Sequence, residues 1–193
     1  YWGLVTQVDK SVGAIIEKLD SLGLSENTIV VFTSDHGTMM GAHKIVNKDI
    51  MFEESVRVPL MIKDARHKEK SRTINRRVSQ IDLVPTLIDM LGYEQPYYLP
   101  GKSLIPNLEE REELSRDVFI EWPNARTVVT QDGWKLALIQ NDKSLLFNLN
   151  TDPRETNNLF YSPEYEEKVQ MLRQKILEWQ VQTNDRLQIE SVN

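Results

Sequence analysis

A change of hydrophobic periodicity near residue 28 constrains the fold of this chain more than any other feature. Before it, apolar residues recur at three- and four-residue steps, as on a helix with one apolar face: Val5, Val8, Val12, Ile15, Leu19 and Leu22. Residues 28–33 (TIVVFT) then form an unbroken β-branched and aromatic run, which is typical of a strand covered on both faces. A helix, a short loop and a buried strand make half of a βαβ unit, so the sequence predicts an α/β fold.

Composition excludes several classes of protein. The 193 residues are 40% hydrophobic and 27% charged, which is ordinary for a globular chain. Lys and Arg number 23 against 29 Asp and Glu, so the net charge is −6 and we expect no nucleic-acid partner. No apolar run approaches the roughly 18 residues of a membrane span, and we expect none. The chain has no cysteine, which excludes disulfides, thiolate metal sites and a cysteine nucleophile within it.

The middle of the chain contains a second strand, a helix and a break. We predict a strand at 56–62 (VRVPLMI), at a sheet edge because Pro59 cannot donate a ladder hydrogen bond. Ser79 can cap a helix that runs to Leu91. The stretch 93–117, which is rich in proline and charge, indicates a linker or subdomain boundary.

The last third of the chain is predicted to form an antiparallel meander with a helix over it. Four short strand candidates separated by turn residues lie at 118–121, 127–130, 134–139 and 145–149. A final helix at about 163–187 carries one apolar face: Val169, Leu172, Ile176 and Trp179. We expect this face to cover one side of the meander.

The residues that carry chemistry follow the first predicted strand, where ligands bind in open α/β sheets. Asp35 and His36 stand side by side there, with His43 and Lys48 close behind. A carboxylate, an imidazole and an ammonium group at one point can bind a metal ion and neutralise an oxyanion such as sulfate or phosphate. The alternative is that Asp35-His36-Gly37 is only a turn and that Lys48 is an ordinary surface lysine.

The longer string from Thr33 to Ile62 resembles the sulfatases of the alkaline phosphatase superfamily. The shared pattern is Asp-His-Gly after a strand, Gly-x-His, a lysine five residues beyond that histidine, and then Glu-Glu-Ser-x-Arg-Val-Pro-Leu. Residues 80–87 (QIDLVPTL) and 146–159 (LFNLNTDPRETNNL) are similar to further family segments, in the same order. The resemblance covers nearly the whole chain.

The resemblance implies a fold and a set of site residues. It implies the C-terminal part of an alkaline-phosphatase-like α/β sandwich at 1–107, followed by a small antiparallel sheet with a covering C-terminal helix at 108–193. Asp35 and His36 match ligands of one divalent cation, Lys48 matches the lysine that contacts the sulfate, and His43 lies near the pocket. Calcium is the metal implied, although imidazole chemistry alone indicates zinc or manganese, so the metal's identity stays open.

The family's nucleophile is missing from this chain. It is a formylglycine made from Cys or Ser in a C/S-x-P-x-R motif of the N-terminal half, and the chain has neither a cysteine nor a Ser-x-Pro-x-Arg. We therefore interpret the chain as the C-terminal portion of a sulfatase that needs its N-terminal half as a partner. Alone, it is expected to be inactive and to form oligomers through uncovered apolar surface.

Three functions remain open at this point. The first is hydrolysis of sulfate esters, with sulfated carbohydrates as the leading substrate class. The second is hydrolysis of phosphoesters or phosphonates by the same superfamily, and the third is a non-catalytic interaction module. The resemblance allows an extracytoplasmic location (periplasmic, secreted or lysosomal) or a cytoplasmic one, and the sequence does not decide between them.

Overall fold

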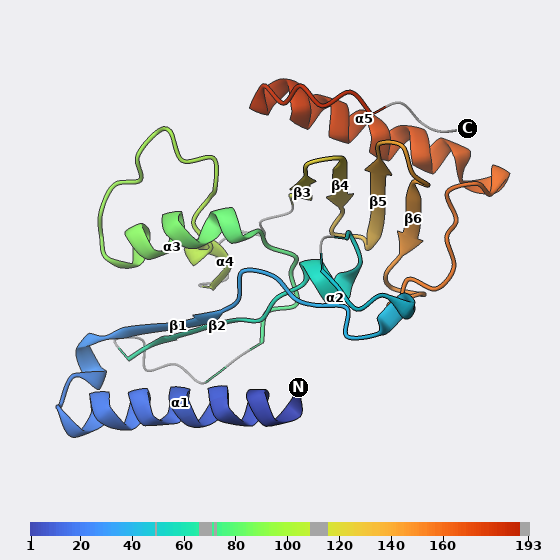
Figure 1. Ribbon diagram of the computed structural model, residues 1–193. Coiled ribbons are helices and arrows are strands. Elements are labelled where there is room, and N and C mark those ends of the chain that lie inside the picture. Colours follow the sequence, from blue (N-terminus) through green and yellow to red (C-terminus); the bar gives the residue numbers. More distant parts are fainter. Residues whose placement is uncertain (49, 66–70, 72, 109–115, 190–193) are drawn as a thin grey trace.

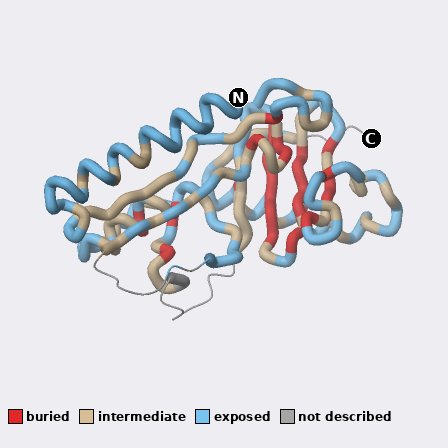
Figure 2. Tube along the Cα trace, turned by 90° about the horizontal axis from the view of Figure 1, so that it is seen from below, coloured by how far each residue is buried: buried red, intermediate tan, exposed pale blue. Residues whose placement is uncertain are grey.

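The computed structural model describes residues 1–48, 50–65, 71, 73–108 and 116–189. It consists of a two-stranded sheet with helices near it, followed by a four-stranded meander with a long helix (Figure 1). Figure 2 shows that the buried residues gather in the meander, whereas the N-terminal helix is exposed along most of its length. Within the described ranges, no helix is both long and apolar enough to cross a bilayer.

The first helix and the first strand form where the sequence predicts them. Helix α1 spans Trp2–Ser21, and strand β1 spans Ile29–Thr33. Gly23, at φ +67°, ends the helical turn in a conformation that favours glycine. No residue of α1 is buried, so its apolar stripe is left largely exposed.

Strand β1 pairs with the second strand of the chain, a pairing that the sequence did not predict. Its partner is β2 (Leu60–Asp64), and the two strands are antiparallel, with Phe32 opposite Met61. The two strands can pair in this direction because the chain between them turns back on itself. Residues 29–32 are half-buried, not fully covered.

The second strand begins later than predicted. Residues Glu53–Val56 form a short helix, α2, and Pro59 lies just before β2. A strand of 56–62 is wrong at its start, since Val56 belongs to the helix. Proline at the position before the first ladder residue costs the sheet no donor.

The predicted central helix is confirmed in two parts. A 3₁₀ turn, η3 (Gln80–Asp82), leads into α3 (Leu83–Met90), and Ser79 forms a capping box with Asp82. The predicted linker contains a short helix, α4 (Ile105–Leu108). Its charged part at 109–115 lies outside the described residues, beside the expected boundary at 107/108.

The meander is confirmed as an antiparallel sheet in sequence order. Its strands are β3 (Val118–Trp122), β4 (Ala125–Val129), β5 (Trp134–Ile139) and β6 (Leu145–Asn148). Gly133, at φ +92°, makes the predicted turn between β4 and β5.

Both faces of the meander are covered, from different parts of the chain (Figure 1). Helix α5 (Glu166–Thr183), which follows the 3₁₀ turn η4 (Pro163–Tyr165), covers one face, as predicted. Its buried residues Val169, Leu172 and Ile176 pack against this cluster of strand side chains: Val128, Leu136, Leu138 and Leu146. The opposite face packs against Met39, Met51 and Phe52, which the sequence did not predict.

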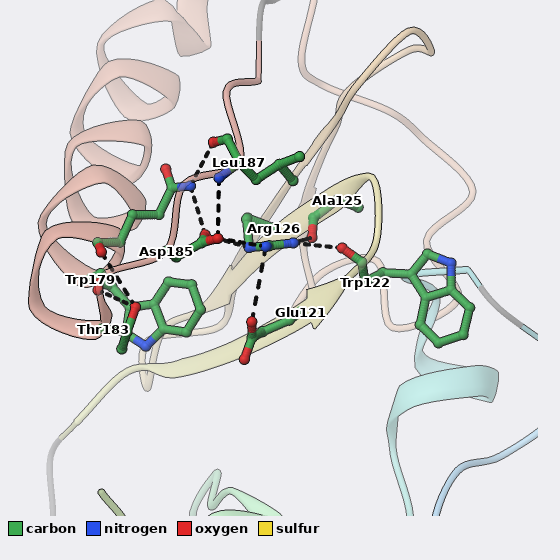
Figure 3. A network of polar contacts seen from close by, with 9 residues as sticks. Glu121, Trp122, Ala125, Arg126, Trp179, Thr183, Asp185 and Leu187 are labelled. Atoms are coloured by element: carbon green, nitrogen blue, oxygen red, sulfur yellow. Dashed lines mark hydrogen bonds and ion pairs between the residues drawn. The ribbon is translucent and has the colours of Figure 1, made fainter.

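An ion pair fixes the chain beyond α5 to the meander (Figure 3). The nearly buried Arg126 on β4 donates from Nε and Nη2 to the two carboxylate oxygens of Asp185, at 2.6 and 2.7 Å. Its Nη1 donates to the carbonyls of Trp122 and Ala125, and Gln180 donates to Asp185. This bidentate bond lowers the pKa of Asp185 well below its usual range.

Candidate functional site

A tight polar turn directly after β1 presents Asp35 and His36 to solvent. The Ser34 hydroxyl donates to the His36 carbonyl at 2.9 Å, and the His36 N–H donates to Asp35 Oδ1 at 2.9 Å. The His36 N–H bond is the largest cause of a lowered pKa for Asp35. The turn therefore keeps an ionised carboxylate at the end of the strand.

The imidazole of His36 joins three groups. Its Nδ1 lies 2.8 Å from the Gly37 carbonyl, and because a carbonyl can only accept, Nδ1 carries the proton in the neutral ring. Its Nε2 then has a free lone pair and accepts a hydrogen bond from Lys48 Nζ at 2.7 Å. Asp35 Oδ2 lies 3.2 Å from the same Nε2. The structure thus brings Asp35, His36 and Lys48 together at one point.

His43 lies in a different environment from the other three candidates. Its ring stacks on Phe52, with centroids 3.8 Å apart and planes 8° from parallel. Its Nε2 lies 3.8 Å from Glu54 Oε2, and its side chain is 17% exposed. His43 adopts φ +51°, a left-handed conformation. These two contacts join His43 to the segment that precedes β2.

Gly37 allows the turn to press against α2. The Gly37 N–H donates to the Ser55 carbonyl at 2.8 Å. A Cβ at position 37 would lie 2.0 Å from the Glu54 carbonyl oxygen, which is closer than any side chain tolerates. The glycine of the Asp-His-Gly motif is therefore required for this backbone approach, and it places His36 relative to α2.

A buried ion cluster of Glu53, Lys135 and Glu155 holds the first residue of α2. Lys135 of β5 is 1% exposed, and its Nζ lies 2.9 Å from Glu53 Oε1 and 2.8 Å from Glu155 Oε1. Glu155 Oε2 accepts the Glu53 N–H at 2.6 Å, at the first residue of the helix. Burial raises the pKa of Glu155, while Lys135 acts against that shift. Sequence reasoning missed this cluster, because no local pattern pairs residues so far apart in the chain.

The donor set at the turn fits part of a cation site. Asp35 supplies an ionised oxygen, and His36 supplies an imidazole nitrogen whose other nitrogen is held by a backbone carbonyl, as is common for metal-bound histidines. Over the part of the chain that the structure describes, no group of three or more His, Cys, Asp or Glu side chains converges as a metal site. Calcium takes six to eight ligands, so these two residues would supply only part of its shell.

The chain is similar to known hydrolases in sequence. The family model for sulfatases matches residues 1–93. The multifunctional alkaline phosphatase superfamily protein PehA of Trinickia caryophylli is 35% identical over 96% of this chain and 40% of its own length. The N-acetylglucosamine-6-O-sulfatase of Bacteroides thetaiotaomicron is 33% identical over 96% of this chain and 36% of its own length.

The fold of the chain is also similar to that of solved hydrolase structures. The phosphonate monoester hydrolase of Agrobacterium radiobacter superposes with a TM-score of 0.83 at 28% identity. The superposition covers 94% of this chain and 40% of that one. The chain thus spans about two fifths of the length of the curated relatives it matches. From its sequence motifs, its matched segment and its fold, the chain belongs to the sulfatase family of the alkaline phosphatase superfamily.

Proposed function

We propose that this chain supplies cation-binding and sulfate-binding residues to the active site of a sulfuric ester hydrolase. The observation that carries the proposal is the meeting of Asp35, His36 and Lys48 at one imidazole nitrogen. Asp35 and His36 would hold one divalent cation, for which calcium is our first expectation. When bound, this cation would draw negative charge from the sulfuryl oxygens.

Lys48 is suited to bind the anionic group of the substrate. Its ammonium group now donates to His36 Nε2, the same lone pair that a metal ion would take. The two cannot share that nitrogen, so metal binding would release Lys48 to a neighbouring position. An exposed ammonium beside a bound cation is a good partner for a tetrahedral oxyanion.

For His43 we propose a place at the edge of the pocket. Its stacking on Phe52 and its contact with Glu54 support a role in shaping the segment before β2. The nucleophile, a formylglycine, would come from a part of the protein outside this chain. We also propose the division into a catalytic α/β part at 1–107 and a β subdomain at 108–193.

Sulfated carbohydrates are the substrate class we propose first. The support is the likeness to an N-acetylglucosamine-6-O-sulfatase. Phosphonate or phosphoester hydrolysis is the second candidate, supported by the likeness to a phosphonate monoester hydrolase. Both reactions present a tetrahedral oxyanion to the same lysine and cation.

The test uses the complete reading frame that contains this sequence, produced together with a formylglycine-generating enzyme. We expect hydrolysis of 4-nitrophenyl sulfate and of glucosamine 6-sulfate, and a loss of about 10²–10³-fold in kcat/KM for Lys48→Ala. Lys143→Ala, an exposed lysine in the turn before β6, is the control and should keep full activity. Phosphonate hydrolysis without sulfate hydrolysis would favour the second candidate, and no loss in Lys48→Ala would contradict the proposed site.

A further inference from the structure

The side-chain amide of Gln80 crosses from η3 to the turn that carries Asp35 and His36. Its Nε2 donates to the Ser34 carbonyl and, at 3.2 Å, to the Asp35 carbonyl. A primary amide has two N–H donors, so one side chain can hold two successive carbonyls. We infer that Gln80 is a positioning residue that fixes this backbone and so sets the direction of the Asp35 and His36 side chains. Its functional meaning rests on the cation site proposed above.

The other bonds of the turn do not replace this contact. The Ser34 hydroxyl and the His36 N–H bond within the turn itself, so they fix its local shape but not its place on the molecule. Among the residues that the structure describes, two contacts join the Ser34–Gly37 backbone to elements beyond β1. One is the Gly37 bond to Ser55 of α2, and the other is the Gln80 amide.

Gln80 projects from a firmly held support. The neighbouring Asp82 is fully buried, and its carboxylate accepts the N–H groups of Ser79 at 3.1 Å and Lys102 at 3.0 Å. Arg116 forms an ion pair with the same carboxylate. A side chain can position another segment only if its own backbone is fixed, and η3 meets that condition.

Gln80 itself is exposed, which makes the inference testable without unfolding the protein. A hydrogen bond in contact with water contributes little to the free energy of folding, since water can replace it. The loss of this hydrogen bond can nevertheless displace the Asp35 turn without changing the stability of the whole protein.

The chain offers a matched control in Gln131. Its Nε2 also donates to two backbone carbonyls, those of Arg77 at 2.8 Å and Arg116 at 2.7 Å. Within the described part of the chain, the hydrogen bonds of Gln131 go to Arg77 and Arg116 and not to the Asp35 turn. Gln131→Met therefore removes two such amide bonds from another place, together with the bond that Gln131 Oε1 accepts from the Arg77 N–H at 3.2 Å, and Gln80→Met removes two amide bonds from the turn.

The first measurement is amide hydrogen exchange of the full chain by NMR. In Gln80→Met we expect exchange at His36 and Gly37 to quicken about threefold to tenfold, as for the loss of one or two modest hydrogen bonds. The urea midpoint should stay unchanged, and Gln131→Met should leave these two amides as they are. Gln80→Glu, which keeps the length but lacks the N–H donors, should reproduce the effect. Unchanged exchange in both Gln80 variants would overturn the inference.

The second measurement is Mn²⁺ binding by the complete reading frame, followed by electron paramagnetic resonance. We expect Gln80→Met to weaken binding about threefold to tenfold and Gln131→Met to leave it unchanged. Faster exchange together with unaltered Mn²⁺ affinity would overturn the claim that Gln80 positions the ligands. If Asp35→Asn had no effect on Mn²⁺ binding, the proposed cation site would be wrong. The exchange data would then still decide whether Gln80 fixes the turn.

Discussion

Glu155 caps the first residue of α2 from 102 positions away in the chain. Its Oε2 accepts the Glu53 N–H at 2.6 Å, while its Oε1 lies 2.8 Å from Lys135 Nζ. The helix that supports the Asp35 turn is thus held by residues of the C-terminal region. We therefore expect the stability of the protein to depend strongly on the buried Lys135.

Lys135→Met should destabilise the protein by about 3–5 kcal/mol, because it leaves the carboxylates of Glu53 and Glu155 together without their cation. Urea denaturation measures the change in the free energy of unfolding. Lys175→Met is the control, because Lys175 pairs with Asp117 while 38% of its side chain is exposed, and its loss should cost about 0–1 kcal/mol. Equal losses of unfolding free energy in the two variants would show that the buried ion cluster contributes no more than a partly exposed ion pair.

The stability of the chain should fall in acid through Asp185. Hydrogen bonding to Arg126 lowers the pKa of Asp185 from its ordinary value of 3.8, so the folded protein binds this proton more weakly than the unfolded chain does. The stabilisation is complete above that ordinary pKa and is lost as the pH falls toward the lowered one. Urea unfolding between pH 2 and 7 should show a smaller acid-dependent loss in Asp185→Asn than in the wild type. Parallel pH curves would contradict this assignment.

Gly37→Ala should cost about 1–3 kcal/mol, since the new methyl group would overlap the Glu54 carbonyl and the backbone must move. The same displacement should lower activity, because it shifts His36 relative to Lys48. Gly13→Ala is the matched control: nothing lies within 4 Å of its Cβ position on α1, and alanine there should stabilise by about 0.5–1 kcal/mol. Thermal unfolding, together with a sulfatase assay of the complete reading frame, tests the pair.

Substitutions of the two histidines should differ in their effect on the affinity for a cation. His36→Phe removes the Nε2 atom that faces Asp35 and should weaken Mn²⁺ binding by about tenfold or more. His43→Phe keeps a ring that can stack on Phe52 and should leave the affinity within about twofold. Isothermal titration calorimetry of the complete reading frame gives both values. A greater effect of His43→Phe would place His43, not His36, at the cation.

The exposed stripe of α1 should make the isolated chain self-associate. Val8 and Ile15 are 52% and 61% exposed, and they lie two helical turns apart on the stripe. Replacing both by Gln should weaken association by about tenfold or more, since each apolar side chain contributes about 1.5–3 kcal/mol when buried. Asp9→Asn with Glu17→Gln is the polar control on the same helix. Sedimentation velocity that shows a monomeric wild-type chain would refute the prediction.

Local patterns predicted most of the elements, and long-range pairing was beyond them. The helical stripe of α1, the unbroken apolar run of β1 and the turn at Gly133 each depend on a few neighbouring residues. The antiparallel partner of β1 depends on how the long loop after Thr33 folds back, which no periodicity encodes. Val56 was misassigned for a similar reason, because Glu155 caps the helix that contains it from far along the chain.

The sequence could predict the kind of candidate site, but it could not predict the residues that hold that site in place. Asp35, His36 and Lys48 follow one strand within a short stretch, so their spacing allowed a shared site, and the resemblance to sulfatases favoured that site over an ordinary turn. Gln80 carried no signal of its own, since a glutamine beside a helix cap is ordinary. Its contact with Ser34 depends on two loops meeting in space.

The covering of the meander by Met39, Met51 and Phe52 has a consequence for dissecting this protein. A linker-like sequence invites a cut near residue 107, yet such a cut would separate Phe52 from Phe147, whose rings lie 5.9 Å apart in a shared apolar cluster. The segment that carries Lys48 and the C-terminal sheet should therefore melt as one cooperative unit. Neither piece should fold on its own, so the proposed boundary near residue 107 would divide a shared core and not two independent modules.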